Sequence, residues 1–158
     1  MTERDAFFMK RAIALAEKGM NSNEGGPFGA VIVKDNKIIA EGNNNVTSTN
    51  DPTAHAEVIA IRKACEKLNT FQLEDCTIYT SCEPCPMCLG AIYWARPKKV
   101  FYACNKNDAA QIDFDDQFIY DEIDKPIGKR NIPFVRLLQD EGRVVFKKWA
   151  EKEDKTEY

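Results

Sequence analysis

The sequence predicts an α/β fold, in which helices alternate with strands along the chain. Apolar residues recur at helical spacing in several segments, and short runs rich in β-branched residues lie between those segments. Residues 76–104 follow the order strand, helix, strand, which implies a parallel pair of strands. With 158 residues, of which 44% are hydrophobic and 30% charged, the chain has the size and composition of one folded domain. We therefore expect a single domain over residues 1–158.

The first part of the chain predicts a helix followed by a β-hairpin. Apolar residues between Phe7 and Ala16 recur at helical spacing, and Gly19 is a suitable residue to end that helix. Residues 29–43 then contain two β-branched runs on either side of Asp35-Asn36, a polar pair that suits the turn of an antiparallel hairpin.

The remaining elements alternate between helix and strand. Asp51 precedes a proline, as an N-cap residue does before a proline in the first turn, and the apolar spacing that follows predicts a helix over residues 53–68. By the same criteria we expect strands over residues 76–81, 98–104 and 133–138, and helices over residues 86–95, 114–123 and 142–154.

Charge and composition restrict the classes of function. The net charge is −3 and the final residues, EKEDKTEY, are mostly charged, which weighs against an extended nucleic-acid partner. The first 19 residues interrupt their apolar positions with charges, so they predict neither a signal peptide nor a membrane span. We expect a cytoplasmic protein with no membrane partner. Thiols stay reduced in that compartment, so clustered cysteines indicate metal binding or redox chemistry rather than disulfides.

Three of the six cysteines lie in the segment SCEPCPMC, residues 81–88. Cys85 and Cys88 have C-x-x-C spacing where a predicted strand gives way to a predicted helix, so both sulfurs lie on one side of the first helical turn. The positive end of a helix favours thiolate, which suits both zinc and a redox pair. Cys82 is better explained as a packed thiol than as a ligand, and Cys65, Cys76 and Cys104 are expected in the core.

The segment HAE, residues 55–57, contains the only histidine of the chain. We place His55 in the first turn of its helix, and two helix N-termini would then bring His55, Cys85 and Cys88 together. One His and two Cys leave the fourth position of a tetrahedral zinc ion to water, which is the arrangement of catalytic zinc. Glu57 would then move that water's protons. Together, H-x-E and P-C-x-x-C form the signature of zinc-dependent base deaminases.

Longer stretches carry a more specific resemblance. GGPFGAVIVKDNKIIAEGNNN, NDPTAHAEVIAIRKAC, SCEPCPMCLGAIYWARPKKVFYA and DAAQIDFDDQFIY resemble the bacterial guanine deaminases of the cytidine-deaminase-like superfamily. The resemblance implies a three-layer α/β/α sandwich with a mixed five-stranded sheet. It also implies that Phe28 and Trp94 flank the purine ring, that Asn44 hydrogen-bonds to it and that Asp116 contacts its ring edge.

The same resemblance implies a homodimer that exchanges C-terminal segments, over about residues 133–158, so that Tyr158 caps the site of a neighbouring subunit. The implied reaction is hydrolysis of guanine to xanthine and ammonia with one Zn²⁺ per chain and Glu57 as the proton carrier. The alternatives are a guanosine deaminase or a tRNA adenosine deaminase of the same superfamily. Outside deamination, a thiol oxidoreductase would leave His55 and Glu57 unexplained, and a structural zinc module would require a fourth protein ligand.

Overall fold

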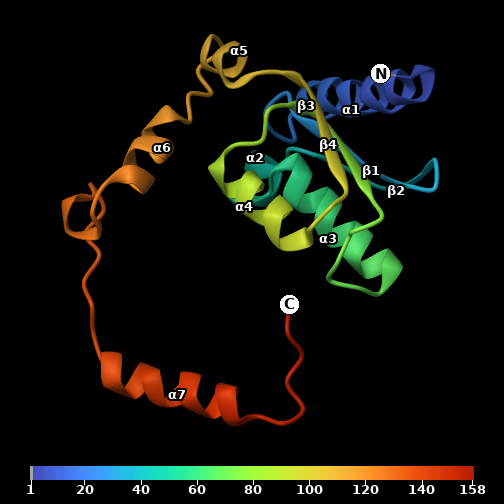
Figure 1. Ribbon diagram of the computed structural model, residues 1–158. Helices are drawn as coiled ribbons and strands as arrows, with labels where there is room; N and C mark the ends of the chain where they lie inside the picture. The colour runs from blue at the N-terminus through green and yellow to red at the C-terminus, as the bar shows by residue number, and fades with distance from the viewer. Residues whose placement is uncertain (1) are drawn as a thin grey trace. The chain divides into compact units, whose positions relative to one another are not determined.

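The computed structural model describes residues 2–158, which divide into two compact units, one extending to Asp116 and the other spanning Gln117–Tyr158. The first unit contains the sheet (Figure 1). Its helices and strands are, in chain order, α1 (Glu3–Asn21), β1 (Gly29–Lys34), β2 (Lys37–Asn43), α2 (Val46–Thr49), α3 (Ala56–Leu68), β3 (Thr77–Cys82), α4 (Pro86–Ala95), β4 (Lys99–Cys104) and α5 (Lys106–Ala110).

The four described strands form one mixed sheet in the order β2-β1-β3-β4. β1 pairs in antiparallel fashion with β2 and β3, and β3 pairs in parallel with β4. The turn between β1 and β2 contains Asp35 and Asn36, both at positive φ, a conformation that asparagine and aspartate tolerate better than most residues. The hairpin and the parallel pair are both confirmed.

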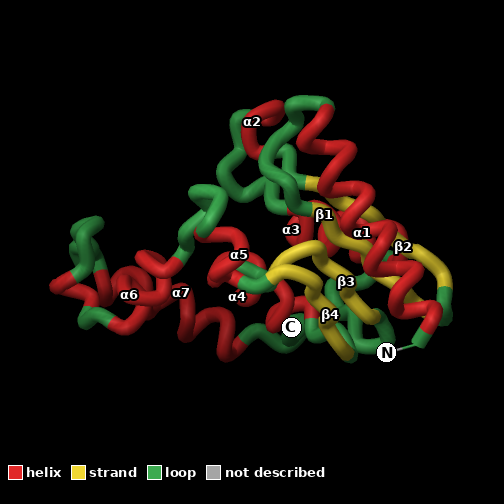
Figure 2. The backbone as a smooth tube through the Cα atoms, turned by 90° about the horizontal axis from the view of Figure 1, so that it is seen from above, coloured by secondary structure: helices red, strands yellow, loops and turns green. Residues whose placement is uncertain are grey.

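Helices cover the two faces of this sheet and give three layers (Figure 2). On one face, α1 packs against β1 and β3, and the apolar cluster there includes Phe8, Leu15 and Val31. On the other face, α3 and α4 enclose a second cluster that includes Ile32, Ile78 and Ile92. The predicted α/β/α sandwich is therefore confirmed, and β3 lies inside the sheet with a strand on each side.

Four details of the sequence prediction were wrong. The described sheet has four strands instead of five, because residues 133–138 form no strand. Helix α3 begins at Ala56, later than predicted, because Asp51 caps a separate turn before it. The short helices α2 and α5 were not foreseen. Cys104 is exposed instead of buried, because β4 lies at an edge of the sheet.

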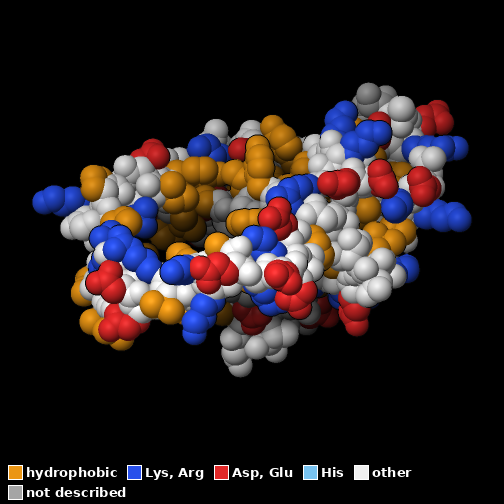
Figure 3. Space-filling model, turned by 60° about the horizontal axis from the view of Figure 1, so that its bottom comes forward, with side chains coloured by type: hydrophobic (Ala, Val, Ile, Leu, Met, Phe, Trp, Pro, Cys, Tyr) orange, Lys and Arg blue, Asp and Glu red, His pale blue; other side chains and the backbone are white. Residues whose placement is uncertain are grey.

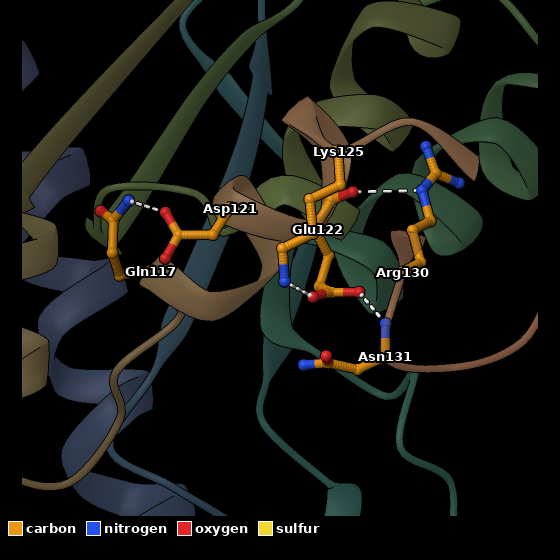
Figure 4. A network of polar contacts seen from close by, with 6 residues as sticks. All are labelled: Gln117, Asp121, Glu122, Lys125, Arg130 and Asn131. Carbon is orange, nitrogen blue, oxygen red and sulfur yellow. Dashed lines mark hydrogen bonds and ion pairs between the residues drawn. The ribbon is translucent and has the colours of Figure 1, made fainter. Parts of the chain in front are cut away.

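The second unit contains α6 (Gln117–Asp124), the 3-10 helix η1 (Ile127–Lys129) and α7 (Gln139–Glu151). Glu122 ties the chain after α6 back to that helix: its carboxylate accepts from the Asn131 N–H at 2.8 Å and pairs with Lys125, and its carbonyl accepts from Arg130 Nε at 3.1 Å (Figure 4). No described residue of Gln117–Tyr158 is buried, and Val135, Leu137 and Phe146 are 85%, 81% and 78% exposed. This unit therefore has polar contacts but no apolar core of its own.

Across residues 2–158, none of the helices combines the length and the apolar character that a membrane span requires.

Candidate active site

The chain reaches His55 through a tight polar turn. The Asp51 carboxylate accepts from the backbone N–H and the hydroxyl of Thr53, at 2.8 and 2.7 Å. His55 follows in extended conformation, with φ −74° and ψ 152°, and is the N-cap residue of α3. The predicted position in the first helical turn was therefore wrong by one residue, because the turn at Asp51 closes before the helix begins. As an N-cap residue with no capping side-chain bond, His55 keeps its ring available for other contacts.

The two cysteines lie at the start of α4, as predicted. Cys85 is the N-cap residue, and Pro86 occupies the first helical position, where its missing N–H costs nothing and its fixed φ favours the helix. Cys88 follows within the first turn and is buried. The C-P-x-C sequence therefore places both sulfurs at one helix N-terminus, where backbone N–H groups stabilise negative charge.

The N-termini of α3 and α4 bring His55, Cys85 and Cys88 together. His55 Nδ1 lies 3.5 Å from the sulfur of Cys85 and 3.5 Å from the sulfur of Cys88, and the three ligand atoms lie within 4.8 Å of one another. In a tetrahedral zinc site, with bonds of about 2.3 Å to sulfur and about 2.0 Å to nitrogen, a ligand sulfur and the ligand nitrogen lie about 3.5 Å apart. Both distances from His55 therefore match those of a tetrahedral zinc site. Among the described residues, no fourth His, Cys, Asp or Glu joins this group.

The charges of this cluster suit a cation. A hydrogen bond from Cys88, together with one from His55, lowers the pKa of Cys85 to about 4, and the same shared proton raises the pKa of Cys88. The bond to Cys85 raises the pKa of His55. The lowered pKa of Cys85 favours its thiolate form beside Cys88 and His55. A zinc ion bound by His55, Cys85 and Cys88 would supply positive charge at this point and take the place of the shared protons.

Glu57 lies beside the cluster in the first turn of α3 and is only 5% exposed. One carboxylate oxygen, Oε1, accepts from the Thr80 hydroxyl at 2.8 Å, and the other, Oε2, lies 3.4 Å from the Cys88 sulfur. Burial raises the pKa of this carboxyl, against the opposing effect of its hydrogen bonds. A buried carboxyl with a raised pKa can both accept and release protons near neutral pH.

A cavity of about 390 Å³ opens over the cluster, and all of its lining residues belong to the first unit. Asn44 forms part of the wall. Its Oδ1 accepts from the backbone N–H groups of Gly26 and Val46, at 3.3 and 3.1 Å, which leaves the amide nitrogen to donate to a ligand. A Cβ atom on Gly25 would lie 2.1 Å from Asn44 Oδ1, so only glycine allows this close approach.

The predicted substrate residues divide into two groups. Phe28 and Asp116 line the cavity together with Asn44. Phe28 meets the ring of Phe114 edge to face, with centroids 4.9 Å apart, and burial raises the pKa of Asp116. Trp94, on α4, is 61% exposed and is not part of the cavity wall. Tyr158 belongs to the second unit and is 68% exposed.

Several residues of the site were not anticipated as such. Thr80 is 1% exposed and contacts Glu57 directly. Cys82 is buried as expected, yet it also lines the cavity, and burial raises its pKa to about 11. Strand periodicity offers the signal that could have revealed both, since Thr80 and Cys82 share one face of β3, two positions apart. Glu83, Lys106 and Phe114 also line the cavity. Glu83 lies in SCEPCPMC and Phe114 in DAAQIDFDDQFIY, but none of the three was predicted as a site residue.

Three protein ligands for zinc, rather than four, next to a buried carboxylate and a cavity, define a zinc-dependent enzyme that uses water as a reactant. Comparison with known proteins agrees. Residues 2–104 match the family described as the cytidine and deoxycytidylate deaminase zinc-binding region. The chain belongs to this family of zinc-binding deaminases.

Individual relatives within this family have named substrates. The chain is 64% identical to the guanine deaminase of Bacillus subtilis over 96% of its own length and 97% of the relative's. A tRNA-specific adenosine deaminase of Aquifex aeolicus is 43% identical, over 61% of this chain and 64% of that protein.

Comparison with solved structures also finds guanine deaminases. An X-ray structure of the B. subtilis guanine deaminase matches with a TM-score of 0.95 and 61% identity, covering 100% of this chain and 99% of that one. A guanine deaminase from Nitrosomonas europaea matches with a TM-score of 0.65 and 32% identity, covering 69% of this chain and 63% of the other.

Proposed function

We propose that this protein is a guanine deaminase, which hydrolyses guanine to xanthine and ammonia. The observation that carries the proposal is the cluster of His55, Cys85 and Cys88 with Glu57 beside it, under a cavity of about 390 Å³. The choice of guanine is supported by the B. subtilis relative, which bears that activity in its name and matches nearly the whole chain. The tRNA-specific relative covers only 61% of the chain.

The reaction adds water at C2 of guanine and expels the amine on that carbon as ammonia. Zinc, when bound by His55, Cys85 and Cys88, lowers the pKa of a water molecule so that hydroxide is available near neutral pH. Glu57 accepts one proton of the attacking water and passes it to a ring nitrogen; it then takes the remaining proton from the new hydroxyl on C2 and delivers it to the departing amine. A single carboxyl can carry out these transfers because its burial keeps its pKa raised.

Recognition of the base is proposed to rest on the cavity wall. Phe28 offers an aromatic face for stacking. The Asn44 amide nitrogen donates toward an acceptor on the purine, and Asp116 accepts from the N–H groups on its edge. A base that lacks those partners would leave these polar groups unpaired, which is costly in a buried site. Trp94 is proposed as the second aromatic flank.

A tRNA substrate is less well supported than a free base. The net charge of the chain is −3, and positive and negative side chains are interspersed on the face drawn in Figure 3. A polyanion requires a concentration of positive charge.

All six cysteines are free thiols, which supports the proposal of a cytoplasmic location.

One assay tests the proposed substrate. Purified protein is supplied separately with guanine, guanosine, adenine and cytosine, and ammonia and the deaminated product are measured. We expect ammonia release from guanine to be at least tenfold faster than from each of the other three substrates. Preference for guanosine would identify a nucleoside deaminase with the same chemistry, and no ammonia from any of them would reject deamination.

We further propose that the protein is a homodimer that exchanges its C-terminal segment. Two features support this: β4 is an edge strand, and residues 133–138 are strand-like in composition but pair with no strand. The exposed apolar side chains of Gln117–Tyr158 are also unusual for an isolated chain. The exchanged segment would bring Tyr158 to the partner's site.

Mixed dimers test the exchange. Two variants, Glu57→Gln and Tyr158→Ala, are each impaired in their own dimers and are then refolded together. With exchange, one site of the mixed dimer has an intact Glu57 and receives an intact Tyr158, so activity rises above the average of the two parents. Without exchange, every site carries one defect and activity stays at that average. Light scattering gives the oligomeric state independently.

A further inference from the structure

The hydroxyl of Thr80 holds one oxygen of the Glu57 carboxylate by a hydrogen bond. Its Oγ1 donates to Glu57 Oε1 at 2.8 Å, and the two residues are only 1% and 5% exposed. Thr80 lies in β3, where its backbone is held between Ala30 of β1 and Tyr102 of β4. The donor is therefore part of the most constrained strand of the sheet, whereas the carboxylate stands on a side chain with several rotatable bonds.

The two oxygens of Glu57 have different surroundings. Oε1 is held by Thr80 from the sheet, and Oε2 lies 3.4 Å from the sulfur of Cys88, on the side of the metal ligands. A carboxyl that receives a proton in one step and delivers it in another needs one oxygen directed at the reactants throughout. A hydrogen bond to the opposite oxygen provides this orientation. Oε2 itself accepts from the Cys88 thiol here, and a Cys88 thiolate that binds zinc would have no proton to donate to it.

We propose that Thr80 is a positioning residue for the reaction: it anchors Oε1 so that Oε2 is the oxygen that exchanges protons with water and substrate. The inference rests on the proposed deamination, since it assigns the two oxygens of the proton carrier to different tasks. Thr80 itself does not line the cavity. Its effect should therefore fall on the rate of the bound complex and leave substrate affinity nearly unchanged.

Paired substitutions separate the hydroxyl from the shape of the side chain. Thr80→Val keeps the branched shape and removes the donor, whereas Thr80→Ser keeps the donor and removes a methyl group. We expect Thr80→Val to lower kcat about 10- to 100-fold, because a buried hydrogen bond to a charged group is lost, with KM within about threefold of wild type. Thr80→Ser should retain kcat within about threefold. Zinc content should stay at one per chain in both variants.

The neighbouring hydroxyl of Ser81 offers a matched control. It is also buried, at 7% exposed, but it accepts from the backbone N–H of Gly29 and is not part of the cavity wall. Ser81→Ala should lower the melting temperature without changing kcat. A crystal structure of Thr80→Val should show the Glu57 carboxylate rotated from its wild-type position. If Thr80→Val folds poorly, Thr80→Ala provides a second variant without the donor, with rates expressed per zinc-loaded site.

The results that overturn the inference are distinct from those that overturn the function. If wild-type protein releases ammonia from guanine but Thr80→Val keeps a kcat within threefold, Thr80 does not position Glu57 and the proposed function stands. The inference also fails if Thr80→Ser is as slow as Thr80→Val, or if Thr80→Val loses zinc. If wild-type protein releases no ammonia from any base, the proposed function itself fails.

Discussion

Two adjacent residues of β3 make the same kind of hydrogen bond on opposite faces of the sheet. Tyr79 donates its hydroxyl to Asp5 on the α1 face, and Thr80 donates its hydroxyl to Glu57 on the α3 face, both at 2.8 Å. Asp5 belongs to the capping box of α1. Its carboxylate accepts from the backbone N–H of Thr2, and this bond, together with the one from Tyr79, lowers the pKa of the Asp5 carboxyl. Burial instead raises the pKa of Glu57.

The difference shows that the surroundings of a carboxylate, more than its hydrogen-bond partner, decide what it can do. Near water, a hydroxyl donor helps to keep Asp5 charged, and the result is a stable helix start. In the interior, desolvation outweighs the same bond, and Glu57 becomes a group that can take up a proton. By the proposed mechanism, one strand thus serves stability on one face and chemistry on the other. Substitutions on the two faces should separate these properties.

The largest expected effect is that of Glu57→Gln on the α3 face. The amide is similar in shape but cannot carry a proton, so turnover of guanine should fall by about 10²- to 10⁴-fold. Because Glu57 is not among the three ligand residues, zinc should remain at one per chain. Product chromatography and metal analysis measure the two quantities. Substantial xanthine formation by the zinc-loaded variant would remove Glu57 from the mechanism.

A smaller loss of activity is expected from Gly25→Ala. The added Cβ would lie 2.1 Å from Asn44 Oδ1 and 2.6 Å from the Asn44 carbonyl oxygen, so the backbone must shift. We expect kcat/KM to fall by roughly 10- to 100-fold, because Asn44 is displaced from its position in the cavity wall. Gly90→Ala in α4 is the matched control, since a Cβ there meets nothing within 4 Å. Equal kinetics for both variants would contradict the role of Asn44.

On the α1 face, Tyr79→Phe should change stability and leave catalysis intact. The ring keeps its stacking on Phe101, whose centroid lies 5.0 Å away, and only the hydroxyl is lost. We expect the free energy of unfolding to fall by about 1 kcal/mol, with kcat within threefold of wild type. Urea denaturation and the guanine assay provide the two measurements. A tenfold loss of kcat would show that the two faces are not separable.

The smallest effect concerns the ion pair of Arg11 and Glu41, also on the α1 face. Its hydrogen bond lowers the pKa of Glu41 below the ordinary 4.5. The pair therefore stabilises the fold above that pH, and the contribution is lost as pH falls through the lowered value. Since the side chains are 45% and 30% exposed, Glu41→Gln should cost only about 0.2–1 kcal/mol at pH 7. The difference in free energy of unfolding between wild type and Glu41→Gln, measured by denaturation, should be smaller at pH 3 than at pH 7. An equal difference at both pH values would contradict this role of the ion pair.

The zinc cluster could be predicted from the sequence because its ligands lie at local landmarks. Cys85 and Cys88 share one helix start, marked by Pro86, and His55 with Glu57 completes a recognisable pattern. Strand periodicity and the turn at Asp35-Asn36 likewise sufficed for the hairpin.

Other features depended on long-range packing. A threonine in a strand is ordinary: strand periodicity places Thr80 on the same face as Cys82, but it does not specify the contact with Glu57, 23 positions away in the chain. The start of α3 was misplaced because an aspartate before a proline caps a turn as well as a helix. Residues 133–138 have the composition of a strand but find no strand partner within the chain, so local propensity alone gave a wrong element.

The arrangement of the metal ligands is tested most directly by anomalous diffraction from crystals of the purified protein at the zinc absorption edge. A single peak per chain is expected, about 2.3 Å from the sulfurs of Cys85 and Cys88 and about 2.0 Å from a ring nitrogen of His55, with no other protein atom bound. No peak at this position, or a peak with four protein ligands, would contradict a catalytic zinc site.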